Sequence, residues 1–153
     1  MDFLFVDRIV QLDSGSRIVT EKLFRNDDEY LKDHFPGSPL VPATLILESM
    51  VQAAVWLARA GTGFEHLHWM LDGVSMFKVS RPIRPEAMIT STVNLEIGDS
   101  GKDDRMALRA QASASGETIA SARFTLRRAE PPVGLDLSVY GKECAARIAT
   151  LTD

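Results

Sequence analysis

Cysteine is almost absent from this chain of 153 residues. The single Cys144 cannot form an internal disulfide, which favours a reducing compartment and predicts a cytoplasmic protein. No neighbouring residue in the sequence favours a reactive thiolate, so we interpret Cys144 as a structural residue. An excess of basic residues is also lacking, because 17 lysines and arginines stand against 21 acidic residues, for a net charge of −4. Since phosphate binding needs a basic surface, this balance argues against a nucleic-acid partner.

Targeting and membrane signals are lacking as well. The N-terminal residues MDFLFVDRIVQLD have an acid at position 2 and no basic leader region, so we expect no signal peptide. The most apolar stretch, residues 43–60, is shorter than the roughly 20 residues of a membrane-spanning helix, and it contains Glu48 and Gln52. We therefore expect no membrane span. The length, with 45% hydrophobic and 25% charged residues, indicates one globular domain.

The stretch 43–60 predicts a long buried helix. Pro42 suits the first turn, where its missing N–H costs nothing, and Gly61 suits the left-handed residue that ends a helix. Apolar residues point in every direction around the predicted axis, as in a helix that is buried on all sides. The polar exceptions Thr44, Glu48 and Gln52 are four residues apart and share one stripe, where we expect the chemistry.

The rest of the chain is typical of β-strands. Alternating or apolar runs predict strands at 3–12, 17–24, 70–79, 88–97, 105–115 and 118–128, with a polar hairpin loop at 98–104. Residues 26–35 predict one or two helical turns capped by Asn26 or Asp27. Since long antiparallel strands with one polar face need a cover on the other, we predict an α+β fold with a curved antiparallel sheet wrapped around the buried helix.

The C-terminal residues 136–151 predict a short helix. Its apolar side would hold Leu137, Tyr140, Cys144, Ile148 and Leu151.

Two histidine patterns stand out. His34 begins HFPGSPLVP, whose three prolines restrict the backbone and hold the histidine in a defined place. His66 and His68 have the His-x-His spacing of a metal pair, but no third ligand has suitable spacing, which favours surface or partly packed histidines. Taken singly, His34 is also typical of a turn residue and Glu48 of a buried carboxylate paired with Gln52.

The segments FLFVDRIVQLDSG and HFPGSPLVPATLILESMVQAA resemble the β-hydroxyacyl-acyl carrier protein dehydratases of fatty acid synthesis, which have the hotdog fold. The resemblance runs from about Phe3 to Arg127, through GVSMFKVSRPIRP, and divides the chain into a dehydratase-like domain at 1–128 and an extension of unknown role at 129–153. His34 and Glu48 are 14 residues apart, as in that family.

The resemblance implies a site at a dimer interface, with His34 from one subunit as the base and Glu48 from the other as the acid. The carboxylate is Glu, whereas the branch that also isomerises the double bond has Asp, which favours dehydration alone. It further implies substrate binding by the residues Gly37, Pro42, the Ala43 backbone and Gln52. The family usually has Gly at the position of Ala43, whose added methyl group is expected to tighten the pocket.

The implied partner is an acyl carrier protein, in a homodimer or a larger assembly of dimers, and no cofactor is implied. Since such carriers are acidic, Lys78, Arg81 and Arg84 are candidate contacts, although a solvated strand edge explains them equally well.

The chemistry has its own argument from the residues. Loss of water from a 3-hydroxyacyl thioester needs a base for the C2 proton and an acid for the C3 hydroxyl, and the free N–H groups at the helix N-terminus suit the thioester oxygen. Two alternatives stay open: a hotdog acyl thioesterase, and a non-catalytic acyl-binding or scaffold subunit of a synthase complex.

Overall fold

The computed structural model describes residues 3–96 and 104–153. In chain order its elements are β1 (Arg8–Asp13), β2 (Arg17–Phe24), the 3-10 helix η1 (Glu29–Leu31), α1 (Ala43–Gly61), β3 (Trp69–Val79), β4 (Ala87–Leu95), β5 (Arg105–Ala114), β6 (Glu117–Arg128) and α2 (Leu137–Thr152). Most of the loop predicted at 98–104 lies outside the described residues.

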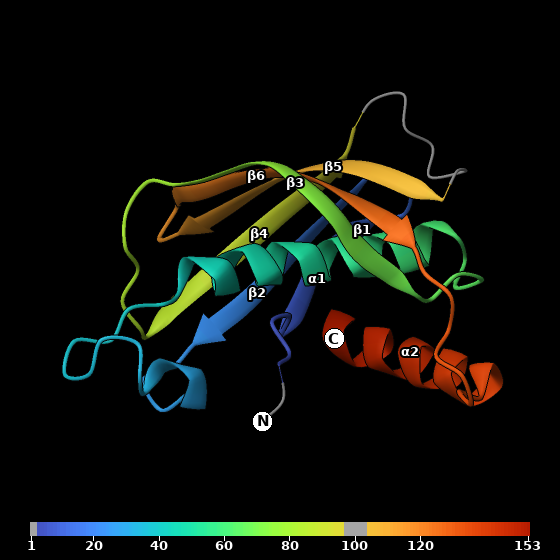
Figure 1. Ribbon diagram of the computed structural model, residues 1–153, viewed down its shortest axis with the longest axis horizontal. Coiled ribbons are helices and arrows are strands. Elements are labelled where there is room, and N and C mark those ends of the chain that lie inside the picture. The colour runs from blue at the N-terminus through green and yellow to red at the C-terminus, as the bar shows by residue number, and fades with distance from the viewer. Residues whose placement is uncertain (1–2, 97–103) are drawn as a thin grey trace.

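One antiparallel sheet of six strands, in the order β1-β2-β4-β5-β6-β3, curves around α1 (Figure 1). The helix contacts β2, β3, β4, β5 and β6, so it forms the centre of the core. The predicted α+β architecture is therefore confirmed, and it is the hotdog fold. The sheet ends on one side at β1 and on the other at β3.

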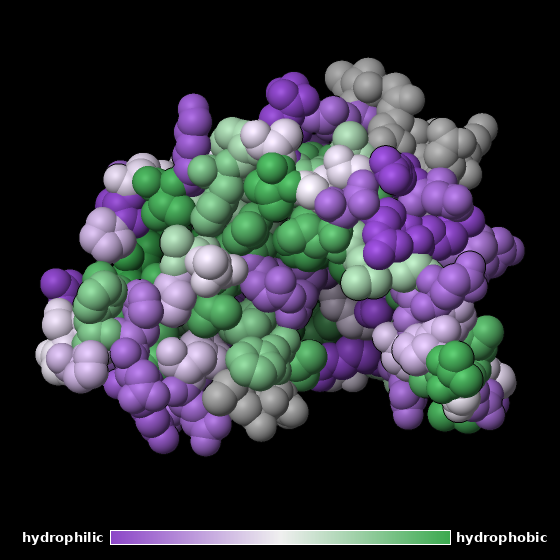
Figure 2. All heavy atoms as spheres, in the orientation of Figure 1, coloured by the Kyte–Doolittle hydropathy of each residue, from purple (hydrophilic) through white to green (hydrophobic). Residues whose placement is uncertain are grey.

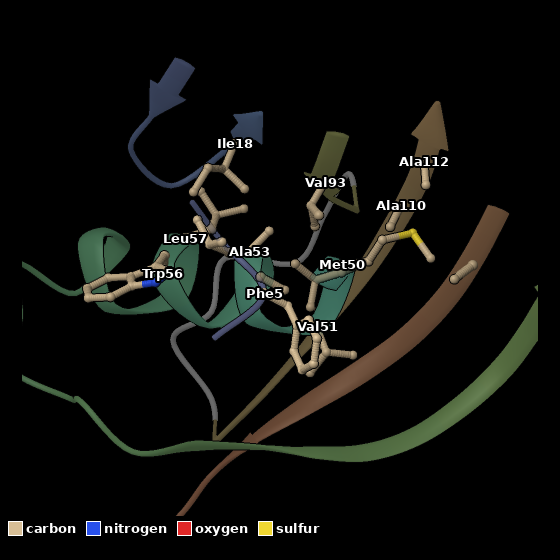
Figure 3. Packing of buried hydrophobic residues seen from close by; sticks show 14 of the residues in the cluster. Phe5, Ile18, Met50, Val51, Ala53, Trp56, Leu57, Val93, Ala110 and Ala112 are labelled. Carbon is tan, nitrogen blue, oxygen red and sulfur yellow. The ribbon is translucent and has the colours of Figure 1, made fainter. Parts of the chain in front are cut away.

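Small side chains on two central strands let α1 approach the sheet closely. Ala110 pairs with Ala122 and Ala112 with Ala120 across β5 and β6, and all four are buried. Figure 3 shows residues of α1, among them Met50, gathered in the core with residues of the strands. The predicted alternation of β5 is confirmed, because Met106, Leu108, Ala110, Ala112 and Ala114 are all buried.

The two ends of α1 differ from the prediction in detail. Pro42 is the residue before the first helical residue rather than part of the first turn. Gly61 is the last helical residue, and the prediction that it is left-handed is wrong. The first left-handed residue after the helix is Gly63, at φ 60°, whose N–H donates to Ala60 O while Phe64 N–H donates to Arg59 O. This pair of bonds is the Schellman motif, which places the glycine two residues later.

Two further predicted elements change near the N-terminus. The strand predicted at 3–12 begins only at Arg8, because the backbone of Phe3 and Phe5 bonds to α1 instead of to a neighbouring strand. The predicted helical turns at 26–35 are reduced to η1, and the residue before it is Asp28 rather than Asn26 or Asp27. The Asp28 carboxylate accepts hydrogen bonds from Arg25 N–H and the Tyr30 hydroxyl. Burial and this carboxylate raise the pKa of Tyr30.

The predicted C-terminal helix is confirmed as α2. Asp136 caps it by accepting hydrogen bonds from Ser138 N–H and Val139 N–H, at 3.0 and 3.2 Å. Cys144 is buried, as expected for a structural thiol, but Leu137 is 52% exposed and does not belong to the packed side.

Helix α2 packs against β1 and the region that follows α1. The Tyr140 hydroxyl accepts a hydrogen bond from Arg59 at 3.0 Å, and its ring stacks on His68 at 5.0 Å. Burial, with Arg59 nearby, lowers the pKa of His68 below its usual 6.5. These contacts join α2 to the end of α1.

Candidate active site

His34 lies in the loop between η1 and α1, and one hydrogen bond defines its chemistry. Its Nδ1 lies 2.8 Å from the carbonyl oxygen of Leu40. Since a carbonyl oxygen only accepts, Nδ1 carries the hydrogen, and Nε2 of the neutral ring keeps a free lone pair. Nε2 is therefore the nitrogen able to accept a proton.

A tight turn and two tertiary contacts hold this loop. Ser38 N–H donates to Phe35 O at 2.9 Å, and Gly37 has φ 80°, which fits a type II turn with Pro36 second and glycine third. Phe35 itself has φ 61°, a conformation that a bulky residue adopts only when its surroundings enforce it.

Contacts with the segment before β4 fix the end of the same loop. Val41 N–H donates to Ile83 O at 2.7 Å, and Arg84 donates to the Ser38 hydroxyl at 3.2 Å. Of the three predicted carrier contacts, Arg84 thus lies against the loop that holds His34. Arg81 pairs with Glu117 at 3.3 Å, and Lys78 is exposed on β3.

The N-terminus of α1 presents free backbone donors. Pro42 O accepts the first hydrogen bonds of the helix, from Leu45 N–H and Ile46 N–H. In the part of the chain that the structure describes, Ala43 N–H and Thr44 N–H donate to no protein group, and both residues are exposed. Ala43 has a helical backbone, so this position does not need the glycine of the family pattern.

The polar stripe of α1 is not covered by the sheet. Thr44 is exposed, whereas Glu48 and Gln52 are half-buried. The prediction that α1 is buried on all sides is therefore wrong for the single chain, because its first turn and this stripe remain open. Glu48 is thus partly exposed on this side of the helix.

Gln52 connects Glu48 to the N-terminal segment. Its Nε2 donates to Glu48 Oε1 at 3.0 Å and to Phe3 O at 2.8 Å, and its Oε1 accepts from Phe5 N–H at 2.8 Å. Both amide hydrogens are thus engaged, and only the second lone pair of Oε1 is left for a substrate. The pairing of Glu48 with Gln52 was expected, whereas no sequence signal indicated the backbone of Phe3 and Phe5.

The remaining predicted residues have structural contacts of their own. Gly37 forms the turn beside His34, and the substrate contacts of Gly37, Pro42 and Ala43 stay predictions.

Within residues 3–96 and 104–153, no three His, Cys, Asp or Glu side chains are grouped to hold a metal ion. His66 O accepts a hydrogen bond from the Trp69 indole at 3.0 Å.

Comparison with known proteins places this geometry in a family. The family model of the FabA-like domain matches residues 1–123. The chain belongs to this FabA-like family. A 3-hydroxyacyl-[acyl-carrier-protein] dehydratase FabZ from Erythrobacter litoralis is 35% identical over 135 residues, which cover 84% of this chain and 85% of the relative. The FabZ of Oenococcus oeni is 34% identical over 78% of this chain and 84% of its own.

Solved structures share the fold of this chain. The dehydratase heterocomplex ApeI:P from Xenorhabdus doucetiae has a chain that superposes with a TM-score of 0.66 at 14% identity, covering 84% of both chains. An uncharacterized protein, PH1136 from Pyrococcus horikoshii, gives a TM-score of 0.61 at 12% identity, over 87% of this chain and 90% of that one. The match to the FabA-like family ends within β6, so α2 lies outside it.

Among the described residues, no helix is long and apolar enough to cross a membrane.

Proposed function

We propose that this protein removes water from a 3-hydroxyacyl thioester carried by acyl carrier protein and forms the trans-2-enoyl thioester. The observation that carries the proposal is the committed tautomer of His34, which leaves Nε2 free as a base in a FabA-like chain. The FabZ relatives, named as 3-hydroxyacyl-[acyl-carrier-protein] dehydratases, support the substrate and the reaction. The presence of Glu48 rather than Asp supports dehydration without isomerisation.

In the proposed reaction, Nε2 of His34 takes the proton from C2 while the C3–O bond breaks. The Glu48 carboxyl group gives its proton to the departing hydroxyl, which leaves as water, and the electron pair from C2 forms the double bond. The proton then returns from His34 to Glu48 for the next turnover. This chemistry needs neither a metal nor a redox cofactor.

The free donors of α1 have a role in the same step. Negative charge develops on the thioester oxygen as C2 loses its proton, and Ala43 N–H and Thr44 N–H are available to bind that oxygen. The positive end of the helix dipole favours the charge further. Pro42 and Gly37 shape the backbone around this place.

We propose that the active form is a homodimer, with His34 of one subunit and Glu48 of the other in each site. The open polar stripe of α1 supports this arrangement, because it leaves Glu48 accessible from outside the chain. The edge strand β3 also exposes large apolar side chains, namely Met70, Leu71, Val74 and Val79. Figure 2 shows hydrophobic side chains on the face that β3 crosses. Such an exposed edge favours pairing with a second chain.

The proposed carrier surface includes Arg84, beside the histidine loop, with Arg81 and Lys78 nearby in the sequence. Acyl carrier proteins are acidic, so these cations provide the complementary charge. A cytoplasmic location fits the single, buried Cys144, which needs no oxidising compartment.

The test is hydration of a trans-2-enoyl thioester by the purified protein, measured as the loss of the enoyl absorbance. We expect turnover by the parent and a loss of at least about 100-fold in His34→Ala and in Glu48→Gln. His66→Ala and Glu65→Gln are matched controls outside the site, and both are expected to keep the parent's rate.

Other outcomes identify the alternatives. Release of free thiol without hydration would indicate a thioesterase. Thioester binding without turnover, unchanged in His34→Ala and Glu48→Gln, would indicate a non-catalytic acyl-binding subunit. Either result would contradict the proposed dehydration.

A further inference from the structure

The residues Phe3–Phe5, here called the N-terminal strap, lie on α1 instead of extending β1. They bond to the side chain of Gln52 through their backbone, with Phe5 N–H as a donor and Phe3 O as an acceptor. Phe3 and Leu4 are 58% and 51% exposed, so their side chains contribute little packing to this contact. The backbone of the strap makes the connection to α1.

The strap is anchored in the core. Phe5 is 1% exposed, and its ring lies 6.0 Å from that of Phe24 and 5.5 Å from that of Tyr30. Beyond it, Asp7 N–H donates to Glu21 O at 2.8 Å, which starts the pairing with β2. Because the strap is fixed at this end, its N–H and carbonyl groups hold a defined place beside Gln52.

Those two backbone groups determine the orientation of the Gln52 amide. A backbone N–H can only donate and a carbonyl can only accept, so the amide oxygen must face Phe5 N–H and the NH₂ group must face Phe3 O. The second hydrogen of the NH₂ group then points to Glu48 Oε1, at 3.0 Å. A reversed amide would place oxygen against both of these acceptors.

We propose that the strap positions Glu48 through Gln52 and makes Oε2 the oxygen that delivers the proton. Because Oε1 accepts a hydrogen bond from Gln52, the proton of the neutral carboxyl group belongs on Oε2. In the dehydration proposed above, on which this inference rests, the Oε2–H bond breaks as the C3–O bond breaks, and the hydroxyl leaves as water. Gln52 and the strap are positioning residues and do not touch the reacting atoms.

The direct test removes one hydrogen of the strap. Incorporating phenyllactic acid at position 5 converts the amide between Leu4 and Phe5 into an ester, which deletes the Phe5 N–H and keeps the ring. The ester oxygen repels the Gln52 oxygen, so the amide reverses or becomes mobile. We expect kcat to fall about fivefold to tenfold with KM within about twofold, because misplacing a catalytic group slows the chemical step.

The matched control is the corresponding ester at position 6, made with the hydroxy acid that keeps the valine side chain. Among the described residues, neither Val6 N–H nor Phe5 O forms a hydrogen bond, so this ester is expected to leave kcat unchanged. The thermal midpoints of both ester proteins confirm that they are folded.

A double-mutant cycle separates positioning from general stability. Gln52→Leu removes the connection between the strap and Glu48, so the ester at position 5 is expected to have no further effect on kcat in this background. An ester that lowers kcat by the same factor with and without Gln52, or that leaves kcat unchanged in an active parent, would overturn the inference while the proposed function stands. A parent without hydration activity would overturn both.

Gln52→Glu is a second variant that does not rely on the ester. It keeps the acceptor for Phe5 N–H but has no hydrogen for Glu48 at neutral pH. We expect the variant to have a lower kcat than the parent at neutral pH. The ratio of the two kcat values is expected to rise as the pH falls, because the introduced carboxyl group then takes up a proton. A pH profile parallel to that of the parent would contradict the positioning role.

Discussion

At the scale of the residue, the site depends on backbone geometry as much as on the two side chains that we propose as catalytic. The Leu40 carbonyl selects the tautomer of His34, and the turn at Phe35–Ser38 brings that carbonyl into place. Gly37 has φ 80° in this turn, and a Cβ added there would meet open space. Glycine is therefore needed for its backbone conformation and not because a side chain would clash.

Gly37→Ala tests this requirement. A left-handed backbone costs a residue with a Cβ about 1–2 kcal/mol, so we expect a loss of that size in the free energy of unfolding, together with a lower kcat as the loop shifts. Chemical denaturation and the hydration assay measure the two effects. Gly61→Ala, at a helical position, is the matched control and is expected to lose neither. Full stability in Gly37→Ala would show that the turn adapts without strain.

The sequence predicts the candidate pair of His34 and Glu48 but not the atoms that orient it. The spacing of His34 and Glu48, with one polar stripe on an apolar helix, is a local pattern and is visible in the sequence. Gln52 bonds to Phe3 and Phe5, which lie 49 and 47 positions away from it in the sequence. These bonds use backbone atoms of Phe3 and Phe5, which every residue has. Such a bond does not depend on which side chains stand at positions 3 and 5, so the sequence gives no sign of it.

At the scale of the element, periodicity predicts what each segment becomes, and tertiary contacts decide where it ends. The predicted alternation of β5 and the predicted helix α1 are confirmed. The predicted start of β1 is wrong, because the strap binds α1 instead. The strand order, with β3 at an edge beside β6, follows from long-range pairing that has no local signal.

Helix α2 contains a glycine in its interior that weakens it. A Cβ at Gly141 would lie 3.8 Å from Leu67 Cδ1, an ordinary contact, and the position is helical. We therefore expect Gly141→Ala to stabilise the protein by about 0.5–1 kcal/mol, measured by chemical denaturation. A loss of stability would show that α2 packs too closely on Leu67 to accept a methyl group at position 141.

At the scale of the whole molecule, the sheet has two edges with different surroundings. Helix α2 packs against β1, whereas β3 is an edge with exposed apolar side chains. We therefore expect the second subunit to bind at β3. The partner would then cover the polar stripe of α1, which is open in the single chain.

Val74→Lys on β3 tests this assembly. Val74 is 41% exposed, and Val10 on β1 is 45% exposed, so Val10→Lys is a matched control on the opposite edge. A charge at a buried interface is costly, and we expect Val74→Lys to shift the protein from dimer to monomer in analytical ultracentrifugation and to abolish hydration activity. Dissociation by Val10→Lys instead would place the interface at β1.

The measurement that tests the shared site most directly uses two inactive variants in one dimer. Differently tagged His34→Ala and Glu48→Gln chains are co-expressed, and the heterodimer is purified and assayed for hydration of a trans-2-enoyl thioester. One of its two sites combines His34 of one chain with Glu48 of the other, so we expect about half of the parent's kcat per dimer. The reciprocal heterodimer, parent chain with the doubly substituted His34→Ala/Glu48→Gln chain, is expected to be inactive. An inactive first heterodimer with a half-active reciprocal would contradict the account, because it would place each site within a single chain.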